Sequence, residues 1–325
     1  MMQTEGNARC PLVEVRKLKK FFKIDSRRIL KAVDGVSFSI QKGETMGLVG
    51  ESGCGKTTCG RTLLRLYEPT AGQVLFEGKD VAGAKTRRQK LEFKKDAQMI
   101  FQDPYSAIDP RMTIRETIAE GLTVHGKYTA AERKDIVHQL LGSIGLTQDF
   151  GNRFPHELSG GQCQRVGIAR ALSVSPRFII CDEPISALDV SIQAQIVNLL
   201  MELQEKMELT YLFISHDLSM VKHISDNVGV MYLGTLVEMA ESNELFAHAA
   251  HPYTKALISA IPTADPDFEA RRQRVKLAGE VPSPLSPPSG CCFHTRCPRA
   301  DALCAKEAPE LKEQCAGHLV ACHHC

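Results

Sequence analysis

Short runs in which apolar and polar residues alternate open the chain, and they predict β-structure. Residues 12–40 alternate over most of their length, which indicates two strands separated by an insert, FKIDSRRILKAVDG. The apolar run TMGLVG (45–50) predicts a buried strand, and TCGRTLLRLYEP after it predicts a helix that ends at Pro69. Two further strands are expected at QVLFEG (73–78) and QMIFQD (98–103). The N-terminal part is therefore predicted to be mostly β-structure.

The apolar spacing becomes helical between Thr113 and about Ser175, where TIRETIAEGLTVHG and TAAERKDIVHQLLGSIG are amphipathic. Strands return at RFIICDEP (177–184) and LTYLFISHD (209–217), with a helix, VSIQAQIVNLLMELQEKM, between them. The stretch NVGVMYLGTLVEM is expected to form two short strands with a turn at Gly234. Strands that alternate with helices predict an α/β fold, in which a parallel sheet is covered on both faces.

The overall composition is that of a globular protein with no strong charge. The chain has 325 residues, of which 43% are hydrophobic and 24% charged, and its formal net charge is +2. This balance gives no electrostatic case for nucleic acid, and the basic run at 85–96 is interpreted as a solvated face. The N-terminus lacks a secretory pattern, and no run approaches the ~18 apolar residues of a spanning helix. We expect a soluble chain, or one that reaches a membrane only through partners.

The character of the chain changes after about Ala264. The stretch RRQRVKLAGEVPSPLSPPSG is first charged and then proline-rich, so it is expected to be extended. Seven of the 12 cysteines then lie between Cys291 and Cys325. Because no export signal is visible, disulfides are a poor expectation. Clustered thiols in a reducing compartment indicate a metal or cluster site instead.

A glycine-rich loop between a predicted strand and a predicted helix carries the first chemical signal. Residues 50–57 read GESGCGKT and fit the pattern GxxxxGK[ST]. Glycines allow backbone N–H groups to surround a phosphate, and the helix N-terminus adds the positive end of its dipole. Lys56 is expected to reach the β- and γ-phosphates, and the Thr57 hydroxyl to bind Mg²⁺. The residues expected to contact the nucleotide are Gly50, Ser52, Gly53, Cys54, Gly55, Lys56, Thr57 and Thr58.

Polar residues at the ends of three other strands fit the same site. Asp182 follows the apolar run FIIC and suits a Mg²⁺ contact, while Glu183 is placed to polarise the attacking water. His216 ends the run FIS, on a strand expected to lie beside that of Asp182, and Gln102 ends MIF. Ligands of open α/β sheets bind at the carboxyl ends of the strands. These four side chains are therefore predicted to converge on the γ-phosphate, with Gln102 also near Mg²⁺.

A second glycine-rich stretch, LSGGQ (158–162), begins the helix QCQRVGIARAL. Ser159, Gly160 and Gly161 offer hydroxyl and amide donors at a helix N-terminus, which makes a second anion site. With the acidic strand end that follows, this stretch resembles the ATPase subunits of ABC transporters. The resemblance implies that two subunits pair head to tail, and that each offers Ser159, Gly160, Gly161 and Gln162 to the ATP of the other.

Other residues match the same family one by one. The run Ser186-Ala187-Leu188-Asp189 resembles the loop that links the two nucleotide sites, with Asp189 facing the shared ATP. Gln102 resembles the residue that senses the γ-phosphate and opens the segment facing the membrane subunits. An aromatic residue upstream normally stacks on adenine; Phe22 is the first choice, Phe21 the alternative, and a core role is equally open. Cys163 departs from the family, which usually has Gln or Arg there, and little effect on hydrolysis is expected.

The resemblance covers nearly the whole chain and narrows toward its end. The segments HPYTKALISAIP (251–262) and LAGEVPSPLSPPSGC (277–291), and the tail CFHTRCP…C…HLVAC, resemble bacterial dipeptide and oligopeptide importers, in particular their F-type ATPase subunit. The resemblance implies an ATPase that powers peptide import from the cytoplasmic face of the bacterial inner membrane. Its partners would be a D-type ATPase, two membrane permeases and an extracytoplasmic peptide-binding protein. Nickel importers are close relatives, so another cargo stays open.

The cysteine tail is predicted to hold a metal group. Four thiolates are the usual complement of an iron–sulfur cluster and also of structural zinc. The resemblance favours a [4Fe–4S] cluster, with zinc as the alternative and free thiols left open. The ligands it implies are Cys291, Cys297, Cys304 and Cys322, with Cys292 in a variable position. Such a cluster would tie down a proline-rich tail that cannot build its own core.

Two other function classes are alternatives to a transport ATPase. A soluble ABC ATPase of translation or DNA repair usually carries two cassettes or a long coiled coil, and the sequence shows neither. A P-loop kinase is disfavoured by LSGGQ and by the histidine of FISHD. The expected fold is a P-loop NTPase (RecA-like) core with an N-terminal antiparallel β subdomain. The expected division is an ATPase domain at 12–264, with a helical subdomain at about 104–175, and a Cys-rich extension at 265–325.

Overall fold

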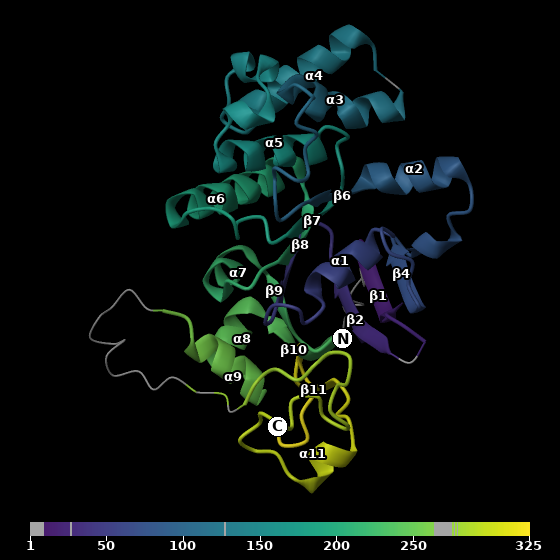
Figure 1. Ribbon diagram of the computed structural model, residues 1–325, viewed down its shortest axis with the longest axis vertical. Coiled ribbons are helices and arrows are strands. Elements are labelled where there is room, and N and C mark those ends of the chain that lie inside the picture. The colour runs from purple at the N-terminus through teal and green to yellow at the C-terminus, as the bar shows by residue number, and fades with distance from the viewer. Residues whose placement is uncertain (1–9, 27, 127, 263–274, 276, 278) are drawn as a thin grey trace, which may run out of the picture.

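The computed structural model describes residues 10–26, 28–126, 128–262, 275, 277 and 279–325. Two sheets organise these residues (Figure 1). The smaller is antiparallel, with strand order β2-β1-β4-β5, and the larger has the order β11-β12-β10-β9-β3-β8-β7-β6. The small sheet consists of β1 (Val13–Lys23), β2 (Ile29–Ile40), β4 (Ala71–Phe76) and β5 (Lys79–Asp80).

The predicted insert between the first two strands is wrong, because FKIDSRRILKAVDG is mostly strand. β1 continues to Lys23 and β2 begins at Ile29, so this stretch is the tip of one long hairpin. The two strands stay paired as far as Lys23 and Ile29 despite register shifts along β1, and the sequence between them is mostly polar.

The centre of the large sheet is parallel and is built from five strands. β3 pairs in parallel with β8 and with β9, β8 with β7, and β7 with β6. These strands are β3 (Thr45–Val49), β6 (Ala97–Ile100), β7 (Phe178–Asp182), β8 (Thr210–Ile214) and β9 (Asn227–Tyr232). The predicted parallel sheet is confirmed, and β7 lies directly beside β8 as expected.

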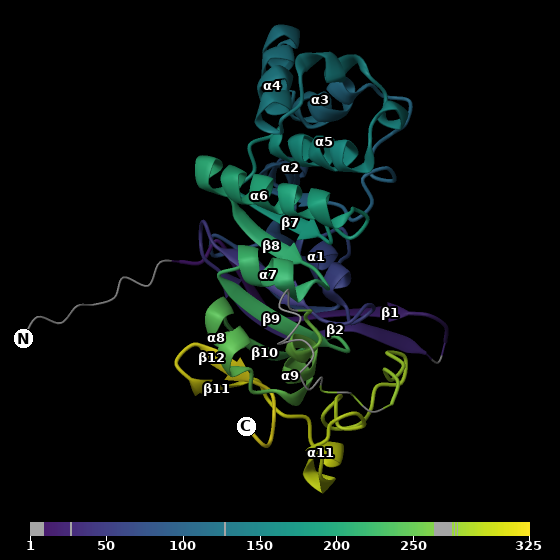
Figure 2. The ribbon, with the colours of Figure 1, turned by 90° about the vertical axis from the view of Figure 1, so that its left-hand side faces the viewer.

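Alternate residues of the central strands belong to two different hydrophobic cores. On β7, Ile179 and Cys181 face helices α5 and α6, whereas Phe178 and Ile180 face α1 and the small sheet. Successive side chains of a strand point to opposite faces, so a strand covered on both faces is apolar throughout. Figure 2 shows α6 and α7 on one face of this sheet and β1 and β2 on the other. These helices are α1 (Lys56–Leu63), α5 (Gly160–Leu172), α6 (Val190–Met207) and α7 (Leu218–Ile224).

Helix α1 is shorter than predicted. It ends at Leu63 rather than at Pro69, because Arg65 takes a left-handed conformation with φ of 55° and the N–H groups of Arg65 and Leu66 bond back to the carbonyls of Thr62 and Arg61. The signal that ends the helix is therefore local backbone geometry, and the proline lies beyond it.

The helical region forms a separate lobe at the top of Figure 1. It contains α3 (Ile114–His125) and α4 (Ala130–Ser143), each starting with a reciprocal capping box, Thr113 with Glu116 and Thr129 with Glu132. Short 3-10 turns at Gln148–Asn152 and Pro155–Glu157 lead into α5. The basic run forms helix α2 (Arg87–Asp96), which has no buried residue, as its interpretation as a solvated face requires.

The Cys-rich end of the chain joins the large sheet. β10 (Thr235–Glu241) continues from β9 through a tight turn, where Leu233 and Gly234 both have positive φ, as a hairpin turn of the mirror-image type needs. β12 then pairs with β10, and β11 with β12. The elements of this end are α8 (Ser242–His248), α9 (Pro252–Ser259), α11 (Ala302–Lys306), β11 (Lys312–Cys315) and β12 (His318–Val320).

A buried contact between a histidine and a glutamate fixes this end to the core. His318 on β12 lies 2.8 Å from the carboxylate of Glu238 on β10, and Glu238 also accepts from the backbone N–H groups of Ala250 and His251. Neither side chain is more than 4% exposed. The sequence did not predict the β11–β12 hairpin, because both strands are short and polar. The expected extended stretch lies partly outside the described residues; from Glu280 to Gly290 it has no helix or strand.

Candidate active site

The phosphate loop is held between two parts of the β-structure. Gly50 and Gly55 have φ of 151° and 108°, and a Cβ added to either would approach a carbonyl oxygen to 2.2 Å or less: that of Met231 for Gly50 and that of Ala32 for Gly55. Only glycine fits either place. The backbone of the loop therefore packs directly against β9 and β2 at these two points.

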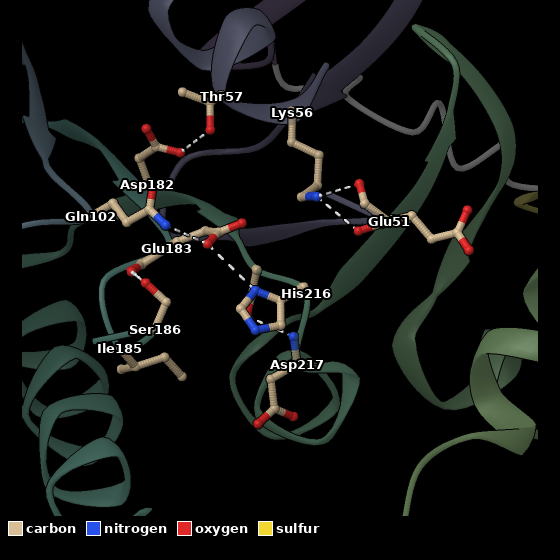
Figure 3. A network of polar contacts seen from close by, with 12 residues as sticks. Glu51, Lys56, Thr57, Gln102, Asp182, Glu183, Ile185, Ser186, His216 and Asp217 are labelled. Carbon is tan, nitrogen blue, oxygen red and sulfur yellow. Dashed lines mark hydrogen bonds and ion pairs between the residues drawn. The ribbon is translucent and has the colours of Figure 1, made fainter. Parts of the chain in front are cut away.

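Lys56 is folded into its own loop. Its ammonium donates to the carbonyl oxygens of Gly50, over 2.7 Å, and Glu51, over 3.1 Å, and its side chain is buried (Figure 3). The helix it begins, α1, has Gly55 as N-cap with no side-chain hydrogen bond to its first N–H groups. An anion at this point would satisfy both the ammonium and the uncapped N–H groups.

Thr57 and Asp182 meet behind the loop. The Thr57 hydroxyl donates to one carboxylate oxygen of Asp182 over 2.7 Å. The other oxygen of Asp182 is fully buried and has no hydrogen-bond partner among the described residues, although Arg61 lies 3.8 Å away. Burial raises the pKa of this carboxyl above its usual range. A carboxylate oxygen left in this state beside a threonine hydroxyl fits a divalent cation.

Glu183, Gln102 and His216 form a second group of contacts next to this pair. The Gln102 amide donates to a carboxylate oxygen of Glu183 over 2.9 Å, and Nδ1 of His216 lies 3.4 Å from the same oxygen (Figure 3). Glu183 has a left-handed backbone with φ of 45°, held by the hydrogen bond from its N–H to the carbonyl of Ile214 on β8. Strain of this kind is typical of functional sites.

One cavity of about 250 Å³ contains most of the predicted nucleotide contacts. It is lined by the loop from Ser52 to Thr58, by Gln102 and Glu183, and by residues that the sequence did not indicate: Leu30, Lys31, Ala32, Leu233, Gly234 and Pro284. The first five of these come from β2 and the β9–β10 turn, and Pro284 comes from the Cys-rich end. Only the register of the strands could have indicated that these residues line the cavity, and the alternation of apolar and polar residues does not determine that register.

Neither candidate for the adenine contact lines this cavity. Phe22 packs edge-on against Tyr67, with ring centroids 5.3 Å apart, and the Lys20 ammonium lies 4.8 Å from the centre of the Phe22 ring. Phe21 is flanked by Lys19 and Lys31. The assignment of an adenine-stacking ring therefore stays a prediction.

The LSGGQ loop lies away from the cavity of its own chain. Ser159 caps α5, where its hydroxyl accepts from the N–H of Gln162 and the Gln162 side chain accepts from the N–H of Ser159. Asp189 caps α6 in the same way, accepting from the N–H of Ile192. A Cβ on Gly161 would lie 2.7 Å from Ile192, so this glycine permits close packing of the two helix starts. None of the residues 158–162 or Asp189 lines the cavity.

The four predicted cluster cysteines come from three separate segments that the fold brings together. The N–H of Cys291 donates to the carbonyl of Cys304 over 2.8 Å. Burial raises the pKa of Cys291 to about 11, and the thiols of Cys304 and Cys297 add to it; burial also raises that of Cys297, with a contribution from Cys322. Cys304 also lies 3.5 Å from Nε2 of His324. Of the five cysteines between residues 10 and 181, all but Cys10 are buried.

Comparison with known proteins agrees with this geometry. The family described as ABC transporter matches residues 33–186, and that described as oligopeptide/dipeptide transporter, C-terminal region, matches residues 237–304. The putative oligopeptide transport ATP-binding protein YkfD of Bacillus subtilis is 56% identical over 97% of this chain and 96% of its own length. The chain belongs to the ATP-binding proteins of ABC transporters.

Other relatives and solved structures extend the match. The oligopeptide transport ATP-binding protein AppF of B. subtilis is 54% identical over 96% of this chain and 97% of its own. The structure of cbiO1 from Clostridium perfringens, part of an ABC transporter complex, is 27% identical with a TM-score of 0.65, over 73% of this chain and 91% of that one. The cassette MJ0796, a dimer with ADP and phosphate, has the same identity and TM-score, over 71% and 98%. This ABC subunit is thus a P-loop ATPase, and its described helices include none long and apolar enough to span a membrane.

Proposed function

We propose that this ABC ATPase powers the import of di- and oligopeptides. Two observations support this cargo: the match of residues 237–304 to a peptide-transporter region, and 54–56% identity to proteins named for oligopeptide transport. ABC importers work with permeases and a substrate-binding protein, and this subunit would bind its permeases at the cytoplasmic face of a bacterial membrane. Its proposed partner at the nucleotide sites is a related D-type ATPase.

The mechanism follows from where the polar groups lie. Lys56 and the N-terminus of α1 would bind the β- and γ-phosphates, while Thr57, Asp182 and Gln102 would hold Mg²⁺, which supplies charge neutralisation on the phosphates. Glu183 would orient and polarise the attacking water, and His216 would keep that carboxylate in place. Catalysis of this kind is mostly positioning and charge stabilisation.

The second anion site, at Ser159, supports a mechanism in which closure of a dimer drives transport. Ser159 is exposed at the start of α5, outside the cavity of its own chain, and Val190 beside Asp189 is 74% exposed. A serine hydroxyl at an exposed helix start, away from the phosphate loop of its own chain, fits an anion held by another subunit. Binding of two ATP molecules would close the dimer at this surface and drive the permeases to change which side of the membrane they face. Hydrolysis would then reopen the dimer.

A groove beside Gln102 is the proposed contact for a permease. It runs between α2, β6, α3 and α5 and is lined by Phe101, the residue before Gln102, and by Leu66, Val124, Lys94 and Arg170. Leu66 and Val124 are 51% and 62% exposed. A short permease helix with apolar and acidic residues would complement this lining, and its movement would follow that of the segment after Gln102.

Uptake by the reconstituted transporter tests the cargo. The complex of this subunit with its permeases and binding protein, placed in lipid vesicles with ATP at the ATPase side, should accumulate labelled di- and oligopeptides. The same vesicles carrying Glu183→Gln should not. Accumulation of Ni²⁺ without peptide would contradict the peptide proposal and leave the ATPase assignment intact.

We also propose that Cys291, Cys297, Cys304 and Cys322 hold a [4Fe–4S] cluster. Two features support this proposal: the Cys291 N–H donates to the carbonyl of Cys304, which brings their two segments together, and four thiols are the ligand set that such a cluster takes. The cluster would have a structural role, joining the loop after Gly290, α11 and the end of β12. A smaller grouping of Asp301, Cys304 and His324 would suit zinc instead.

Metal analysis separates these two possibilities. Protein purified without oxygen should be brown and contain iron and acid-labile sulfide. Cys297→Ser should lose both, while Cys315→Ser, at an exposed cysteine outside the set, should keep them. Zinc without iron in the wild-type protein would contradict the cluster.

A further inference from the structure

The Cys-rich end of the chain makes a direct, bidentate ion pair with the phosphate loop. The guanidinium of Arg296 donates to both carboxylate oxygens of Glu51, over 2.9 and 3.2 Å. Only 7% of the Arg296 side chain and 28% of that of Glu51 are exposed. Paired hydrogen bonds between an arginine and a carboxylate fix both distance and orientation, and partial burial reduces screening by solvent.

Glu51 is held at its backbone as well. Its N–H donates to the hydroxyl of Tyr253 on α9 over 2.9 Å, and its carbonyl accepts from the ammonium of Lys56 over 3.1 Å. The residue next to Gly50 in the nucleotide loop is therefore tied to three other places: α9, the cysteine loop and the lysine that would bind phosphate. The carboxylate, the N–H and the carbonyl of Glu51 are therefore each held by a different contact.

Arg296 is itself held rigidly. Its N–H bonds to the carbonyl of Phe293 over 3.0 Å, and Phe293 is buried against Tyr232 and Tyr253, with ring centroids 5.3 and 5.4 Å away. The guanidinium carbon lies 6.0 Å from the centre of the Tyr232 ring. This aromatic cluster connects the cysteine loop to β9 and α9, so the loop presents Arg296 from a fixed base.

A second segment of the same end reaches the loop. Residues 281–284 line a cavity together with residues 51–54 of the phosphate loop, and Pro284 also lines the nucleotide cavity. The contact between the Cys-rich end and the nucleotide site therefore does not depend on Arg296 alone. Among the described residues, the only ion pair in this contact is that of Arg296 with Glu51.

We infer that Arg296 is a positioning residue for nucleotide binding, through which the folded Cys-rich end sets the affinity of the phosphate loop. Without the ion pair, Glu51 and the loop carbonyls that hold Lys56 would sample more conformations, and binding would have to order them. The inference rests on the ATP-binding role of the chain. It does not depend on peptide as the cargo or on an iron–sulfur cluster.

Binding of MgADP to the purified full chain tests this inference, because it needs neither a dimer nor hydrolysis. Arg296→Gln should raise the dissociation constant on the order of tenfold, the change that loss of about 1.4 kcal/mol produces. In the assembled transporter the same variant should raise KM for ATP by a similar factor and leave kcat within about twofold. Arg299→Gln is the matched control: Arg299 lies in the same loop, is exposed and bonds the carbonyl of His324.

A double-mutant cycle shows whether the effect passes through Glu51. Glu51→Gln and Arg296→Gln should each weaken MgADP binding. The double variant should have about the same MgADP affinity as the single variant that binds less tightly. If Arg296→Gln does not fold, Arg296→Lys keeps the charge without the paired geometry and should lie between it and the wild type. Unchanged MgADP affinity in either single variant, or effects that add in the double variant, would overturn the inference.

Discussion

Gln102 and His216 approach the same carboxylate oxygen of Glu183, at 2.9 and 3.4 Å. The two residues follow β6 and β8, the strands on either side of β7, and the Glu183 side chain lines the cavity that the phosphate loop also lines. Glu183 is therefore oriented before any nucleotide binds. This is the arrangement expected of a group that positions water and takes up its proton.

Replacement of Glu183 should separate binding from turnover. Glu183→Gln keeps the shape and a hydrogen-bonding oxygen but cannot polarise water, so kcat should fall by about 10²–10⁴-fold. ATP binding should persist, and the closed dimer should accumulate, as measured by size-exclusion chromatography with MgATP. Glu202→Gln, at an exposed position of α6, serves as control. Near-normal ATPase activity in Glu183→Gln would show that another residue has this role.

Replacement of Asp182 should stabilise the empty protein. Burial raises the pKa of this carboxyl, so the folded chain keeps the proton to higher pH than the unfolded chain does. The free energy of unfolding therefore decreases as pH rises through that interval, and above it the folded protein holds a buried carboxylate with one oxygen that has no hydrogen-bond partner among the described residues. Asp182→Asn removes this charge and should raise the free energy of unfolding by about 1–2 kcal/mol at neutral pH.

The same variant should lose the effect of magnesium. Thermal unfolding of the wild-type protein with ATP should shift upward when Mg²⁺ is added, because binding stabilises the folded state. Asp182→Asn should not show this shift. Asp109→Asn, at a surface carboxylate paired with Arg111, should keep it and gain no stability. A loss of stability in Asp182→Asn at neutral pH would mean that Arg61 compensates the buried charge.

Two glycines of α5 should respond in opposite directions to the same change. A Cβ on Gly161 would lie 2.7 Å from Cγ2 of Ile192, whereas one on Gly167 would meet nothing within 4 Å. Gly161→Ala should therefore destabilise the protein by about 1–3 kcal/mol. Gly167→Ala should stabilise it by about 0.5–1 kcal/mol, through helix propensity. Urea unfolding measures both.

A compensating change checks the cause. Ile192→Ala removes the atoms that Gly161→Ala would meet, so adding it should reduce the loss that Gly161→Ala causes. Equal losses with and without Ile192→Ala would show that the second glycine of LSGGQ is not needed for packing against α6.

The motifs and the apolar runs next to them predicted the centre of the fold. The strands before Asp182 and His216 are buried on both faces, so their residues are apolar throughout and easy to find. The hairpin of β1 and β2 was misread because its tip is polar, and the end of α1 because a left-handed Arg65 ends it before the proline. Local sequence does not encode either feature strongly.

Sequence patterns do not predict contacts between residues that lie far apart in the chain. Arg296 and Glu51 are 245 residues apart, and neither residue is unusual in its local context. The pairing of β12 with β10 depends in the same way on a buried contact, between His318 and Glu238, that only the folded chain brings together. The site residues that lie within motifs could be named in advance, and the residues that support them could not.

The central claim is that ATP is bound between two subunits, with Ser159 of one facing the nucleotide of the other. The most direct test is a structure of the Glu183→Gln transporter trapped with MgATP. We expect the Ser159 hydroxyl at hydrogen-bonding distance, about 2.5–3.0 Å, from a γ-phosphate oxygen held by the phosphate loop of the neighbouring subunit. A trapped, ATP-filled complex in which Ser159 faces solvent, with no phosphate of a neighbouring subunit near it, would contradict the account.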